Sequence, residues 1–145
     1  MLATQSQTFT ILIAEDDDGH AELVMEQLQD AGVSCPIVRF RDGQEVLDFL
    51  LPDGGPGPDQ PFLLLLDINM PRLDGIAVLK RLKGDPATRA IPVIMLTTTD
   101  DPVEVAACYR LGCNFYITKP VGFEAFAETL GRLGRFLQVL QVAKP

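Results

Sequence analysis

Acidic, threonine or lysine side chains directly follow four of the five apolar runs in this sequence. In chain order they are Glu15, Asp16 and Asp17 after the first run, Asp67 after the third, Thr97 after the fourth and Lys119 after the fifth. Carboxylates that gather at one place repel one another, and their pKa values rise unless a cation lies among them. These residues therefore predict a site that binds a cation.

The donor set indicates which cation and which chemistry. Oxygen ligands without His or Cys suit a hard ion, and Mg²⁺ fits best because it uses one or two carboxylates and leaves positions for water and phosphate. Lys119 could offset part of the negative charge and pair with a phosphoryl oxygen, while Thr97 could donate its hydroxyl to a second one. The residues thus predict Mg²⁺-dependent phosphate chemistry.

Each of these residues also has a plainer explanation. One of Asp16–Asp18 could simply cap the first helix. Capping does not explain Asp67, however, which ends a nearly all-leucine run. Thr97 alone could be a turn residue, and Lys119 alone could be a solvated lysine. The pair Lys119-Pro120 directly after an apolar strand weakens that last alternative.

The elements that must position these residues alternate between two patterns. Apolar, β-branched runs predict strands at Phe9–Ala14, Pro36–Phe40, Phe62–Leu66, Pro92–Leu96 and Phe115–Thr118. Helical spacing predicts helices between Ala21 and Ala31, over Val46–Leu51, Ile76–Leu82 and Val103–Leu111, and from Phe123 onward. This alternation predicts an α/β fold, a doubly wound parallel sheet with helices on both faces. Ligands bind such a sheet beyond the carboxyl ends of its strands, so the acids converge if the first and third strands are neighbours.

Composition limits the partners and the compartment. The 145 residues fit one domain, and the formal net charge of -8 disfavours nucleic acid as a partner. Three cysteines without CxxC spacing predict reduced, packed thiols. No apolar run approaches the ~20 residues of a membrane span, so we expect a soluble, cytoplasmic protein with no membrane partner. The single histidine, His20, is expected to be solvated near the first helix, without a partner at a telling spacing.

Two segments fall outside this pattern. Pro52–Pro61 holds four prolines and three glycines, which predicts a loop. The last helix continues its apolar spacing further than a small core needs. We expect the core to use Phe126, Leu130 and Leu133, and a homodimer interface to use Phe136, Leu137, Leu140 and Val142. The alternative is that the tail folds back over its own sheet.

Four stretches together resemble the receiver domains of response regulators. They are ILIAEDDDGHAEL, LLLLDINMPRLDG, PVIMLTTTDD and NFYITKPVGFEAF, and the resemblance covers Thr10 to about Leu133. It implies a flavodoxin-like strand order of 2-1-3-4-5, a receiver domain at residues 8–134, an extension of the last helix and a tail at 135–145, and no output domain. It also implies a phosphoryl group received from a sensor histidine kinase and a signalling face made by the fourth helix, fifth strand and fifth helix.

The resemblance assigns roles to individual residues. Asp67 matches the phosphoacceptor, Asp16 a direct Mg²⁺ ligand, Glu15 an acid that acts through water, and Asn69 a residue that offers its backbone carbonyl to the metal. Thr97 and Lys119 match the pair that senses the phosphoryl group, and Tyr116 matches an aromatic switch residue. The Lys119–Pro120 peptide bond matches one that is cis in the family.

A narrower resemblance and three rival functions remain. The long loop before Phe62, the LTTTDDPVEV segment and the apolar last helix resemble single-domain regulators associated with phytochromes, which implies a kinase regulated by red light. The main rival is a small Mg²⁺-dependent phosphatase or phosphotransferase, although Asn69 stands where such enzymes carry a second acid. A flavin-binding domain is disfavoured because the acidic first loop would repel the flavin phosphate. A P-loop hydrolase is excluded because GxxxxGK[ST] is missing.

Overall fold

A computed structural model describes residues 9–52 and 60–142 of the chain. Its five parallel strands lie in the order β2-β1-β3-β4-β5, which confirms the predicted flavodoxin-like topology. The strands are β1 (Thr10–Ala14), β2 (Ile37–Phe40), β3 (Phe62–Leu66), β4 (Val93–Thr97) and β5 (Phe115–Thr118). The helices are α1 (Asp18–Asp30), α2 (Gly43–Leu50), α3 (Gly75–Lys83), α4 (Pro102–Leu111) and α5 (Phe123–Val139).

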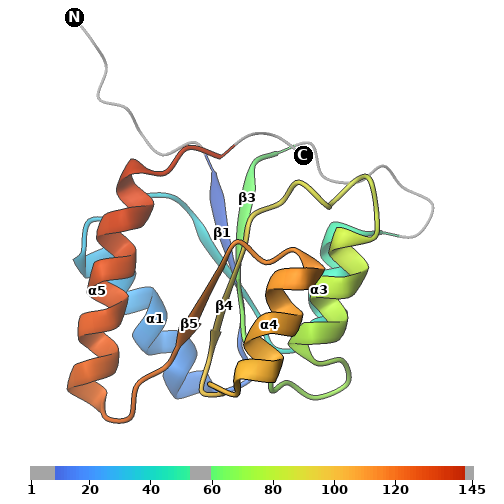
Figure 1. The fold of residues 1–145 in the computed structure, drawn as a ribbon. Coiled ribbons are helices and arrows are strands. Elements are labelled where there is room, and N and C mark those ends of the chain that lie inside the picture. Colours follow the sequence, from blue (N-terminus) through green and yellow to red (C-terminus); the bar gives the residue numbers. More distant parts are fainter. Residues whose placement is uncertain (1–8, 53–59, 143–145) are drawn as a thin grey trace, which may run out of the picture.

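The helices cover the sheet in two layers (Figure 1), because successive side chains of a strand point to opposite faces. In β1, Ile11 and Ile13 belong to the apolar cluster beneath α1 and α5. Leu12 and Ala14 belong to the cluster beneath α2, α3 and α4. The central strands β1, β3 and β4 are therefore covered on both faces, which explains their continuous apolar sequences.

Aspartates begin four of the five helices. Asp17, Asp42, Asp74 and Asp101 each accept a hydrogen bond from a backbone N–H in the first turn of the helix that follows. This satisfies donors that have no partner within the helix. Of the three candidate caps of α1, the structure selects Asp17, which leaves Asp16 available for another role.

The end of α5 differs from the prediction. Phe126, Leu130 and Leu133 are buried as expected, but Leu137 is also fully buried in the cluster beneath α1 and α5. Its assignment to an interface was wrong, because it continues the same stripe of the helix at a spacing of four residues. Leu140 and Val142 pack partly against this cluster as well, so the tail folds back in part over its own domain. Phe136 remains 38% exposed.

Three smaller expectations can be compared with the structure. The three cysteines are buried and free, as predicted. Within residues 9–52 and 60–142, no helix has the length and apolar character needed to cross a bilayer. Most of the predicted loop Pro52–Pro61 lies outside the described residues, which resume at Gln60.

Candidate functional site

The register of the sheet brings the two acidic segments together. Ala14 pairs with Leu66 at the carboxyl ends of β1 and β3, and the Asp67 N–H donates a hydrogen bond of 3.1 Å to the Ala14 carbonyl. Glu15 and Asp16 follow β1 at the same edge. One carboxylate oxygen from each of Glu15, Asp16 and Asp67 lies within 4.8 Å of the others. The predicted cluster of three acids is therefore present.

A buried lysine lies among these acids. The side chain of Lys119 is 2% exposed, and its Nζ donates to Glu15 Oε1 and, over 3.1 Å, to Asp67 Oδ2. Its backbone N–H donates to the Thr97 carbonyl over 2.7 Å, which fixes the end of β5 beside β4. One ammonium group cannot neutralise three carboxylates. The excess negative charge, borne on oxygen donors, suits a divalent cation such as Mg²⁺.

Burial sets the protonation of Glu15. The residue is 3% exposed, and burial raises the pKa of its carboxyl to about 7 despite the opposing influence of Lys119. A cation among these oxygens would favour the ionised carboxylate. The donor set thus fits a metal site, with Glu15 and Asp67 buried and Asp16 open to solvent.

Thr97 carries an unusual hydroxyl at the end of β4. The residue is fully buried, and its Oγ1 finds no hydrogen-bond partner among the described residues. Leaving a buried hydroxyl unpaired costs about 1–3 kcal/mol, which commonly marks a functional group. The hydroxyl and the Lys119 ammonium are both donors at this edge, as a site for phosphoryl oxygens requires.

Tyr116 lies on β5, and its hydroxyl donates a hydrogen bond of 2.7 Å to the Thr99 carbonyl. The residue is half-buried against the α2–α4 side of the core, and burial raises the pKa of its phenol to about 12. Asn69 is exposed beyond Asp67, to whose Oδ1 its N–H donates over 3.3 Å.

The Lys119–Pro120 peptide bond is trans, so the expected cis bond was wrong for this structure. The two isomers of an X–Pro bond differ by only about 0.5–1 kcal/mol, and the dipeptide sequence alone therefore cannot decide between them.

His20 is not simply solvated, as its sequence position suggested. Its Nδ1 lies 3.2 Å from Lys119 Nζ and 3.9 Å from Glu15 Oε1. Its ring packs edge-on against Phe126, with ring centroids 5.7 Å apart and planes at 73°. His20 and Lys119 lie 99 residues apart in the chain, so no local spacing could have indicated this contact.

Arg39 was also missed. From β2 its Nε and Nη2 donate to the Glu15 carbonyl over 3.0 and 2.7 Å, and its Nη1 pairs with Asp18. The guanidinium therefore clamps the loop that carries the first acids. This role depends on β2 lying next to β1, and an isolated arginine in a strand gives no signal of it.

Gly75 is a third residue that sequence reasoning did not select. A Cβ at this position would lie 2.0 Å from the Asp67 carbonyl oxygen, and the Gly75 N–H donates to the Ile68 carbonyl over 2.8 Å. The start of α3 thus packs directly against the backbone of Asp67. The dipeptide Asp74-Gly75, a helix cap followed by glycine, was the available signal.

Comparison with known proteins agrees with this geometry. The family model for the response regulator receiver domain matches residues 11–130. FilR2, a probable methanogenesis regulatory protein of Methanothrix harundinacea, is 35% identical over 88% of this chain and 83% of its own length. The response regulator Rcp1 of Synechocystis is 37% identical over 75% of each chain.

Solved structures give the same assignment. A receiver domain from Rhodospirillum rubrum has a TM-score of 0.90 and 46% identity, over 93% of this chain and 97% of its own. Rcp1 in its Mn²⁺-bound form has a TM-score of 0.82 and 31% identity, over 92% of this chain and 98% of its own. Phosphorylated RcpA, a cyanobacterial phytochrome response regulator, has a TM-score of 0.80 and 29% identity, over 94% and 99%.

Proteins of this family bind a divalent metal at an acidic pocket and interact with histidine kinases. The family assignment does not favour a phosphatase acting on free substrates. The chain belongs to the response regulator receiver domain family and is a phosphoacceptor of two-component signal transduction.

Proposed function

We propose that Asp67 receives the phosphoryl group from a histidine kinase, with Mg²⁺ held by Glu15, Asp16, Asp67 and the backbone carbonyl of Asn69. The supporting observation is the buried ammonium of Lys119, 3.1 Å from Asp67 Oδ2 within the cluster of carboxylates. Mg²⁺ would supply charge neutralisation when bound, since phosphoryl transfer depends mainly on positioning and electrostatics.

The transfer exchanges one bond to phosphorus for another. A carboxylate oxygen of Asp67 forms the new P–O bond, and the P–N bond of the kinase phosphohistidine breaks as the imidazole leaves with a proton from solvent. Lys119 and the unpaired hydroxyl of Thr97 donate to phosphoryl oxygens. Water later hydrolyses the acyl phosphate. We propose that the protein catalyses only its own phosphorylation and dephosphorylation.

The signal would leave the site through Thr97 and Tyr116. When the Thr97 hydroxyl pairs with a phosphoryl oxygen, the hydrogen bond from Tyr116 to the Thr99 carbonyl, two residues further on, can break and the aromatic ring can turn inward. The face made by α4, β5 and α5 would present the change to a target.

The kinase partner is proposed to be a phytochrome regulated by red light, because RcpA is described as a phytochrome response regulator. We place the protein with such a kinase in the cytoplasm. Phosphotransfer profiling against the histidine kinases of the host tests this. Fastest labelling by a phytochrome kinase, with the rate changing between red and far-red light, is expected. Fastest labelling by a kinase without a phytochrome sensor would assign another partner. Such a partner is a real alternative, because the relative FilR2 is described as a methanogenesis regulator and not as a phytochrome response regulator.

Asp16→Ala is expected to weaken Mg²⁺ binding by roughly tenfold or more, because Asp16 is the exposed acid of the cluster that we propose as a direct ligand. Titration of Mg²⁺ or Mn²⁺ into the protein measures this. Asp17→Asn is the matched control. It removes the same charge one residue away, and asparagine can still cap α1. Equal metal affinity in Asp16→Ala and wild type would contradict the ligand assignment.

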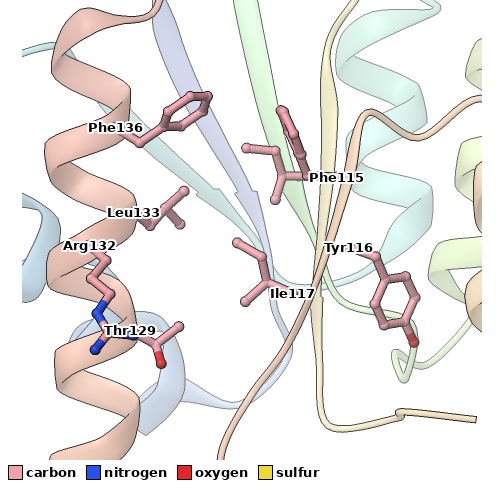
Figure 2. Close-up of a pocket in the computed structure, with 8 residues that line it drawn as sticks. Phe115, Tyr116, Ile117, Thr129, Arg132, Leu133 and Phe136 are labelled. Atoms are coloured by element: carbon pink, nitrogen blue, oxygen red, sulfur yellow. The ribbon is translucent and has the colours of Figure 1, made fainter.

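We propose that residues 8–134 act as the receiver domain and that the end of α5, within 135–145, mediates homodimerisation. A groove of about 360 Å³ runs between β5 and α5, and its walls are mostly apolar. Figure 2 shows Phe115, Ile117, Leu133 and Phe136 turned toward each other across it, with Tyr116 on the opposite side of β5. Phe115 and Phe136 stack edge-on and are 49% and 38% exposed.

Sedimentation at micromolar concentration can test the dimer. We expect wild type to sediment as a dimer and Phe136→Glu as a monomer, because a charge in an apolar interface is desolvated without a partner. Truncation before Phe136 is unsuitable, since it would also remove the buried Leu137. Val38→Glu is the matched control, because Val38 is 39% exposed on β2, at the opposite edge of the sheet. A monomeric wild type would rule out this interface.

A further inference from the structure

We infer that His20 is a positioning residue for Lys119, which it holds between Glu15 and Asp67 by accepting a hydrogen bond at Nδ1. The inference deepens the proposed function and rests on it. An ammonium group has three N–H donors. In the structure Nζ of Lys119 meets three acceptors, which are Glu15 Oε1, Asp67 Oδ2 at 3.1 Å and His20 Nδ1 at 3.2 Å. Each donor of this buried cation thus has its own acceptor.

The contact defines the state of the imidazole. Lysine can only donate, so Nδ1 of His20 must be free of hydrogen, and the proton of the neutral ring must be on Nε2. The side chain is 41% exposed, so solvent reaches the imidazole. His20 therefore acts as a neutral acceptor that adds no charge to a site already rich in carboxylates.

Two further contacts hold His20 in place, one through its backbone and one through its ring. The backbone N–H of His20, in the first turn of α1, donates to the Asp17 cap over 2.9 Å. On its other side the ring packs edge-on against Phe126 of α5, which is 5% exposed and whose ring centroid lies 6.0 Å from Lys119 Nζ. The imidazole is thus fixed by α1 and α5 together, and it can fix the end of a long, flexible lysine side chain.

Positioning of this kind affects the rate of phosphoryl transfer. Lys119 must turn one donor from a carboxylate to the incoming phosphoryl group while it stays near Asp67, and the donor held by His20 keeps the ammonium in place during that exchange. Without an acceptor at His20, the ammonium group is free to turn away from Asp67. We expect labelling of Asp67 to slow roughly tenfold, which is the lower end of what one hydrogen bond to a charged group contributes.

Two substitutions test the hydrogen-bond acceptor and the aromatic ring of His20 separately. His20→Phe keeps an aromatic ring against Phe126 but has no acceptor, whereas His20→Gln keeps an acceptor oxygen and loses the ring. The measurement is the rate of Asp67 labelling by acetyl phosphate with Mg²⁺, together with the thermal midpoint of each variant. We expect His20→Phe to be roughly tenfold slower than wild type, and His20→Gln to regain most of the rate. A His20→Gln variant no faster than His20→Phe would overturn the inference.

A spectroscopic measurement on the wild-type protein without metal keeps the test independent of folding of the variants. Long-range ¹H–¹⁵N correlation at pH 8 reports which imidazole nitrogen carries the proton. A proton on Nε2 is expected, and a proton on Nδ1 would overturn the inference. Absence of wild-type labelling at Asp67 would instead overturn the proposed function, because the tautomer can be read whether or not the site accepts phosphate.

Discussion

Asp67→Asn is expected to abolish phosphoryl labelling by acetyl phosphate and by a histidine kinase. An amide oxygen cannot form the acyl phosphate, and among the described residues only Glu15 shares with Asp67 the burial, the strand-end position and the contact to Lys119. Glu15 also pairs with the lysine, but burial raises the pKa of its carboxyl to about 7. Labelling should therefore fall below detection.

The matched control is Asp30→Asn, an equal change of charge at the exposed end of α1. Radiolabel incorporation and intact-mass spectrometry should give wild-type stoichiometry for the control and none for Asp67→Asn. The asparagine can still accept the hydrogen bond from the Asn69 N–H, so a wild-type circular dichroism spectrum is expected. Persistent labelling of the variant at the wild-type rate would assign the phosphoacceptor to another residue.

The sequence was sufficient to predict where the acids converge. The run Phe62–Leu66 is apolar at every position, and such a strand must be covered on both faces. A parallel sheet places the carboxyl ends of its strands at one edge, so Glu15 and Asp67 had to meet once β1 and β3 were neighbours. The strand order itself came from the family resemblance, because apolar periodicity does not specify which strands pair.

The parts that the sequence could not predict depend on side-chain direction and on distant contacts. Distance along the chain alone is not the obstacle, because Glu15 and Lys119 are 104 residues apart and their positions at strand ends still predicted that they would meet. His20 lies within α1, where helical spacing favours only burial or exposure and does not show that the ring reaches across to Lys119. Leu137 was misassigned because periodicity shows that α5 carries an apolar stripe but does not show how far along the helix the core beneath it extends.

Gly75→Ala is expected to destabilise the fold and to slow phosphorylation together. The added Cβ would lie 2.0 Å from the Asp67 carbonyl oxygen and 2.9 Å from the Ile68 Cα. These are backbone atoms that cannot rotate away, so either α3 or the end of β3 must shift. Overpacking of this kind costs about 1–3 kcal/mol and occasionally more. The shift would also move the carboxylate of Asp67 relative to Lys119.

Gly131→Ala is the matched control, with an expected effect of opposite sign. Gly131 lies in the interior of α5, where a Cβ would meet only the end of the Arg135 side chain, at 3.7 Å. Alanine should therefore raise the free energy of unfolding by up to about 1 kcal/mol, because it favours the helix and restricts the unfolded chain. Urea denaturation measures the free energy of unfolding of both variants, and we expect its dependence on urea concentration to keep the wild-type slope. The rate of labelling by acetyl phosphate should fall only for Gly75→Ala. If the two variants were equally stable, the contact between α3 and the Asp67 backbone would not constrain the site.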